Sequence, residues 1–109
     1  MTDSHHTAAL DMLQRQLSEL DAAEKKTVTE NLNTVGGTEQ VHKWKARTVP
    51  LIAQHLGPAA AKLFADTKPG PSFTNDMFEE FSDEVEVYRS AIRKLMKEVQ
   101  SSGIKGGPA

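Results

Sequence analysis

Apolar residues recur at intervals of three and four from Thr7 onward, the spacing that places them on one face of an α-helix. The residues of this first stripe are Leu10, Leu13, Leu17 and Leu20. Asp21, followed three residues later by Glu24, matches a helix N-cap with a capping box, and the stripe changes phase there. The pattern predicts either a second helix from about Ala22 or a bend in one long helix.

Glycine and proline residues divide the middle of the chain. Gly36-Gly37 predicts a helix stop, since glycine adopts left-handed backbone angles without strain, and Thr38 predicts the cap of the next helix. Pro50 predicts a kink or a fresh start, because an internal proline removes one helical hydrogen bond. Gly57-Pro58 closes this segment and begins a short helix to about Asp66.

The clearest element lies in the C-terminal part of the chain. Residues 67–75 predict a long loop, with Phe73 as its anchor to the core, and Asn75 or Asp76 then caps a long helix. An a/d stripe continues along this helix for three heptads: Phe78, Phe81, Val85, Tyr88, Ile92, Leu95 and Val99. Acidic residues gather near its start and basic residues near its end, as the helix dipole favours.

These patterns predict an all-α protein, a small helical bundle of four or five helices closed by a long amphipathic C-terminal helix. We expect a disordered tail at 1–6, one bundle domain at 7–102, and a flexible tail or linker at 103–109. The buried set includes the leucine stripe, Val28, Leu32, Leu63 and the a/d stripe. With only 6% aromatic residues, the core is predicted to be mainly aliphatic.

Composition excludes several classes of function. The chain has no cysteine, which excludes disulfides, thiolate metal sites and a cysteine nucleophile. The net charge of −2 gives no overall attraction to nucleic acid or anionic membranes. No apolar run approaches the roughly 20 residues of a membrane span, and the N-terminus lacks secretory signal features. We therefore expect a cytoplasmic protein.

No residue pattern indicates catalysis. His5 and His6 lack further ligands at metal-binding spacing, and neither His42 nor His55 has a triad partner. Phosphate-binding loops and the common hydrolase motifs are absent from the sequence. We therefore assign no catalytic residue, metal or cofactor, and expect a protein that is not an enzyme.

Two surfaces are candidates for binding. The stripe of Phe78, Phe81, Val85, Tyr88, Ile92 and Leu95 is either the inner face of the bundle or a contact for a second chain. It spans roughly 30 Å, longer than the helices expected before it, which favours a partner over part of its length. Lys43, Lys45 and Arg47 surround the only tryptophan and are candidate contacts for nucleic acid, although solvated charges beside a core Trp44 explain them as well.

The run Trp44–Gly57, followed by the long helix, resembles a helical N-terminal module of bacterial proteins that end in a TIR-like or nucleotide-binding effector domain. The likeness covers about the second half of the chain, departs at Pro50, and includes no effector domain. It implies a sensing, adaptor or oligomerisation module in a bacterial defence or signalling system, with an effector joined near Gly103–Ala109. We expect a protein–protein interaction, adaptor or self-association module, and a small nucleic-acid-binding regulator as the alternative.

Overall fold

The computed structural model describes residues 2–71 and 73–106, with side chains for 7–71 and 73–101. This part of the chain contains four α-helices and no strand, which confirms the small all-α bundle. The helices are α1 (Thr2–Lys26), α2 (Thr34–Leu56), α3 (Pro58–Ala65) and α4 (Met77–Gly106), with a π-helical turn η1 (Thr27–Asn31) between α1 and α2.

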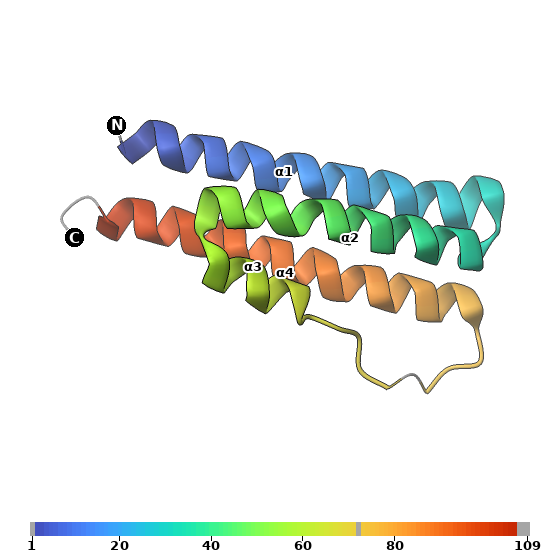
Figure 1. Ribbon diagram of the computed structural model, residues 1–109. Coiled ribbons are helices and arrows are strands. Elements are labelled where there is room, and N and C mark those ends of the chain that lie inside the picture. The colour runs from blue at the N-terminus through green and yellow to red at the C-terminus, as the bar shows by residue number, and fades with distance from the viewer. Residues whose placement is uncertain (1, 72, 107–109) are drawn as a thin grey trace.

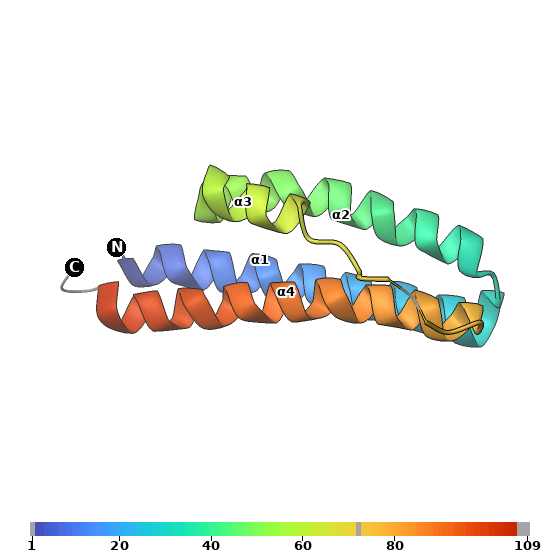
Figure 2. The same ribbon diagram turned by 90° about the horizontal axis from the view of Figure 1, so that it is seen from below.

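The three long helices form an elongated bundle with extents of 50 × 26 × 20 Å (Figure 1). α1 and α2 make an antiparallel hairpin, and α4 runs antiparallel to α1 and therefore in the same direction as α2. The turn η1 and the first turns of α2 and α4 lie together at one end, here named the hairpin end. Figure 2 shows two layers, α2 with the short α3 and α1 with α4.

The break between the first two helices lies earlier than the glycine pair. Leu32 adopts a left-handed conformation with φ 51°, and its N–H donates to the carbonyl of Thr27 at 2.9 Å. Asn33 caps α2, because its side-chain oxygen accepts a hydrogen bond from the Gly36 N–H at 3.1 Å. The predicted stop at Gly36-Gly37 and the predicted cap at Thr38 are therefore wrong.

The glycine at position 37 serves packing rather than termination. A Cβ atom added at Gly37 would lie 2.5 Å from Cγ2 of Thr27 and closer still to its Oγ1. Thr27 is buried and donates its hydroxyl hydrogen to the carbonyl of Ala23 at 2.9 Å, so its side chain is fixed. The close approach of α2 to η1 thus requires a residue without a side chain at this position.

Two predicted helix starts, at about Ala22 and at Pro50, are absent. α1 continues through Asp21 without a cap there, and the helix already begins at Thr2, within the segment expected as a disordered tail. α2 continues through Pro50, which is exposed while Thr48 and Ile52 on the opposite face are fully buried. Packing of that buried face outweighs the hydrogen bond lost at the proline.

Both later helices begin where the sequence indicates. α3 starts with Pro58 in its first turn. Asp76 caps α4, since its Oδ1 accepts hydrogen bonds from the N–H groups of Phe78 at 2.9 Å and Glu79 at 3.2 Å. α4 continues to Gly106, into the expected flexible tail, and residues 107–109 lie outside the described residues.

The core contains an aromatic cluster that composition did not predict. Trp44 of α2, Phe64 of α3 and Tyr88 of α4 pack with ring centroids 5.9–6.5 Å apart. The leucine and a/d stripes surround this cluster as expected, with Leu13, Leu20, Ile52, Val85 and Ile92 fully buried.

Four predicted contacts with the core are wrong. Leu32, Leu63, Phe73 and Phe78 are exposed by 64, 61, 96 and 39%. Leu32 lies between η1 and α2, Leu63 borders a pocket between α3 and α4, and Phe73 is in the connection after α3. Each of these residues therefore lies at the edge of the bundle or outside it.

Candidate functional site

The predicted interaction stripe of α4 is mostly covered by the chain itself. Phe81, Val85, Tyr88, Ile92 and Leu95 are at most 6% exposed, so they form the core of the bundle. α1 and α2 have 25 and 23 residues, longer than the sequence indicated, and together they cover the length of the stripe. Phe78 is the member of the stripe that stays partly exposed, so of the two alternatives the inner face of the bundle holds for the rest of the stripe.

The predicted basic triplet is divided between two sides of α2. Lys43 and Arg47 line a groove of about 420 Å³ between α1 and α2, where Lys26 joins them. Arg47 is 3.7 Å from Glu19 across this groove. Lys45 instead faces α3 and α4, so the three positive charges do not form one surface.

Lys45 belongs to a polar cluster on the seam between α2 and α4. Its ammonium donates to the carbonyl of Thr67 at 2.6 Å and lies 4.8 Å above the ring of Tyr88. Partial burial lowers the pKa of Lys45, against the attraction of Glu84. These contacts tie the end of α3 to both long helices.

Glu84 joins the two helices at the next turn of the same seam. Its Oε2 accepts the Tyr88 hydroxyl at 2.8 Å and lies 2.6 Å from Nε2 of His42. Burial raises the pKa of Tyr88, and the hydrogen bond to Glu84 raises it further. Tyr88 therefore stays neutral at physiological pH, and its hydroxyl donates a hydrogen bond to Glu84.

Beyond Glu84, toward the hairpin end, the seam opens into a groove of about 330 Å³ between the first turns of α2 and α4. We name it the end groove. Its lining combines three carboxylates with three apolar side chains: Glu39, Glu80, Glu84, Val35, Met77 and Phe81. Val35 and Met77 are 63 and 60% exposed, whereas Phe81 is buried and forms the floor. The end groove is therefore an apolar depression with an acidic border.

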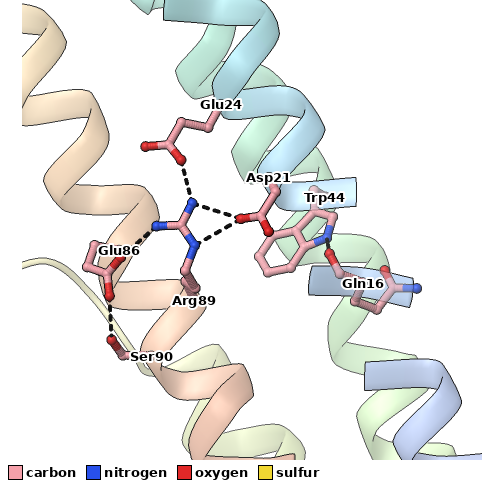
Figure 3. A network of polar contacts seen from close by, with 7 residues as sticks. All are labelled: Gln16, Asp21, Glu24, Trp44, Glu86, Arg89 and Ser90. Atoms are coloured by element: carbon pink, nitrogen blue, oxygen red, sulfur yellow. Dashed lines mark hydrogen bonds and ion pairs between the residues drawn. The ribbon is translucent and has the colours of Figure 1, made fainter. Parts of the chain in front are cut away.

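A separate ionic cluster joins α1 to α4 (Figure 3). Arg89 of α4 binds Asp21 and Glu24 of α1 and also Glu86 of its own helix, at 2.8 Å for Asp21 and 2.6 Å for Glu86. Burial would lower the pKa of Arg89, but the hydrogen bonds that Arg89 donates to the three carboxylates outweigh burial and raise the pKa. Asp21 and Glu24, which the sequence suggested as a capping box, thus hold the bundle together.

The described residues provide no arrangement typical of a metal site. Within them, no group of three or more histidine or acidic side chains could hold an ion. No helix in this part of the chain combines the length and apolar composition needed to cross a membrane. The end groove and the basic groove between α1 and α2 each combine a depression with charged side chains.

The sequence did not indicate the end groove, because its residues come from segments about 40 positions apart in the chain. In the sequence, Val35 appears as the last residue of an apolar helix stripe, and Met77 appears as a residue that widens the a/d stripe. The available signal for the groove was the predicted long loop of residues 67–75, because it places no helix beside the start of α4.

Comparisons of the chain with models of protein families, with curated proteins and with solved structures return no match. Function is therefore argued from the geometry of these surfaces.

Proposed function

We propose that this chain is a non-enzymatic helical interaction module that binds a partner protein through the end groove. The observation that carries the proposal is the exposure of Val35 and Met77 on both sides of a groove with a buried phenylalanine floor. Leu32 and Phe78, next to the groove residues in the chain or one turn from them, are exposed as well. Exposed apolar side chains gathered at a depression with a polar border are typical of protein-binding sites.

The proposal agrees with the adaptor role implied by the resemblance of Trp44–Gly57 to a bacterial helical module. It restricts the contact from the whole a/d stripe to the start of α4, where Phe78 and Phe81 lie. Partner binding at the hairpin end leaves the opposite end, where α1 begins and α4 ends, free for a second contact (Figure 1). We therefore propose an adaptor whose two ends have different roles.

Replacing Val35 and Met77 by Asp tests this function. We expect the double variant to lose binding of a partner by about tenfold or more, since two charges would enter the apolar part of the contact. The partner is identified by mass spectrometry after capture on the wild-type chain, purified, and titrated in calorimetry with a defined stoichiometry. Self-association is measured in parallel by light scattering.

The matched control is the pair Leu63→Asp and Phe73→Asp, which removes two exposed apolar side chains and adds the same charge elsewhere. The control should bind as the wild type does. Equal binding by both double variants would overturn the proposed site, and a monomeric chain for which no partner reconstitutes would overturn the function.

A second candidate function is binding of nucleic acid by the groove that contains Lys26, Lys43 and Arg47. For Lys43→Glu with Arg47→Glu we expect loss of binding to a fluorescent single-stranded oligonucleotide, and a wild-type affinity that falls steeply with salt. Lys45→Gln is the control and should leave this binding unchanged, because Lys45 faces the other side of α2. Salt-independent binding, or equal loss in both variants, contradicts this function.

A further inference from the structure

The bundle contains three long helices and one short one, arranged as an incomplete four-helix bundle. In Figure 2, α2 and α3 form one layer and α1 and α4 the other, so that α3 occupies the fourth corner. α3 has only eight residues, whereas α2 and α4 have 23 and 30. The fourth corner is therefore filled by a helix over only part of its length.

α3 fills its part of the seam between α2 and α4 in a well-defined way. It runs antiparallel to both helices, and Phe64 packs against Trp44 at 5.9 Å and Tyr88 at 6.5 Å. After α3, the ammonium of Lys45 donates a hydrogen bond to the carbonyl of Thr67. The connection to α4 then runs outside the bundle (Figure 1). The helical part of the corner ends at this point.

The end groove continues the same seam. Thr38 lies two turns before Lys45 on α2, and Glu84 lies one turn before Tyr88 on α4, so these residues share the faces that α3 approaches. Between Thr34 and His42 the open stretch of α2 covers about 12 Å at the helical rise of 1.5 Å per residue. About two turns of another helix, at 5.4 Å per turn, fit along it.

The groove offers side chains and almost no free backbone groups. Both of its walls are helices whose backbone hydrogen bonds are internal, and their first turns are capped by Asn33 and Asp76. An extended peptide needs a row of free backbone partners of the kind found at a sheet edge, and two helices do not present such a row. A helix meets its own backbone requirements, as α3 does on the same seam.

The negative charge of the groove indicates the charge of the ligand that it would bind. Its lining contains three glutamates and no lysine or arginine. Glu84 is engaged by His42 and Tyr88, whereas Glu39 and Glu80 have no salt bridge within the described part of the chain. A ligand with lysine or arginine beside its apolar residues would pair with these carboxylates.

We infer that the end groove binds a cationic amphipathic helix of another protein, which continues the line of α3 and completes the four-helix bundle. The inference rests on the proposed function and specifies its partner. The basic half of α4 in a second copy does not supply such a helix, because its apolar residues Ile92, Leu95 and Val99 are buried in its own core.

The probe for this inference is a synthetic helical peptide of roughly 15 residues, with leucines on one face and lysines along both borders, labelled with fluorescein. We expect saturable binding to the full chain in fluorescence anisotropy, a gain of helix in circular dichroism, and shifts of the Val35 and Met77 signals in NMR. A matched peptide with glutamate in place of lysine should not bind, and a version with proline at its centre should bind at least about tenfold more weakly.

The variant Glu39→Lys with Glu80→Lys should weaken binding of the lysine peptide by about tenfold or more, because attraction becomes repulsion. The matched control Asp11→Lys with Glu98→Lys changes the net charge equally at two exposed positions away from the groove and should retain binding. All four positions are exposed, so both variants should remain folded. Glu80 lies in the first turn of α4, where the helix dipole favours an acidic residue, so the groove variant should unfold at a slightly lower temperature than the wild type.

Failure of the lysine peptide to bind, or equal weakening in both charge variants, would overturn the inference. Equal binding of the proline peptide would exclude a helical occupant. If a reconstituted partner depends on Val35 and Met77 but not on Glu39 and Glu80, the proposed function stands and the cationic helix falls. If binding of the partner depends on neither pair of residues, the groove is not its binding site.

Discussion

Replacing Gly37 by alanine should destabilise the protein by about 2 kcal/mol, although alanine is normally favoured over glycine within a helix by about 1 kcal/mol. The added methyl group would lie 2.5 Å from Cγ2 of Thr27. Thr27 is only 3% exposed, and its hydroxyl is bonded to the carbonyl of Ala23, so it cannot rotate away at low cost. Either η1 or the first turn of α2 must move. The measurement is chemical unfolding followed by circular dichroism.

Gly70→Ala is the matched control, because a Cβ atom added at Gly70 meets no atom within 4 Å. We expect this variant to be as stable as the wild type or slightly more stable. Adding Thr27→Ala to Gly37→Ala should recover part of the loss, giving a favourable coupling in a double-mutant cycle. A Gly37→Ala variant more stable than the wild type would show that packing against Thr27 does not determine this residue.

Replacing Arg89 by glutamine should destabilise the bundle by about 2 kcal/mol at neutral pH. The Arg89 side chain is 14% exposed and binds three carboxylates, of which Glu24 is 21% exposed. Without the arginine, Asp21, Glu24 and Glu86 would repel one another between α1 and α4. The expected loss of stability lies between the losses measured for exposed and for fully buried ion pairs, because Asp21 and Glu86 are half exposed.

The same cluster predicts a dependence of stability on pH. Hydrogen bonds from Arg89 and then Ser90 hold the pKa of Glu86 below its ordinary value of 4.5. As the pH falls below that value, the unfolded chain takes up the proton first, so the free energy of unfolding decreases. The contribution of Glu86 is therefore complete above its unfolded pKa and disappears as the pH falls through its lower folded pKa.

In Arg89→Gln this acid-dependent loss should be smaller than in the wild type, because the main cause of the lowered pKa is gone. Arg93→Gln, at an exposed position one turn further along α4, removes the same charge and should keep both the stability and its pH dependence nearly unchanged. Denaturation curves recorded from neutral to acidic pH compare the three proteins. Parallel curves for Arg89→Gln and the wild type would contradict a role of Arg89 in the acid response.

The predictions from the sequence were most reliable where several local signals agreed. The start of α4 at Asp76, the start of α3 at Pro58 and the buried face of α4 each follow from a cap, a proline or a heptad pattern. These features depend on residues within one or two turns of each other. Local hydrogen bonding and side-chain spacing therefore suffice to specify them.

The incorrect predictions concern residues whose role depends on another helix. Asp21 and Glu24 have the spacing of a capping box, but they bind Arg89, which lies 68 and 65 positions away. Gly37 looks like a helix terminator, but it makes room for Thr27. A residue that suits two environments shows its choice only when its neighbours in space are known.

The candidate site could be predicted only in part for the same reason. The sequence located apolar residues near the start of α4 and the basic residues of α2, but not their final surroundings. The structure buried Phe81 and Val85 under α1 and α2, separated Lys45 from Lys43 and Arg47, and brought Val35 next to Met77. Each outcome depends on which faces of the helices meet.

The sequence by itself determined an all-helical bundle, because the period of its apolar residues, its caps and its prolines act within single segments. The tertiary structure decided which face is left for a partner. α3 is too short to complete the fourth corner of the bundle, and the connection after it leads away, so the acidic seam between α2 and α4 stays open at the hairpin end. That opening is a property of how long helices are placed against a short one, which no local pattern records.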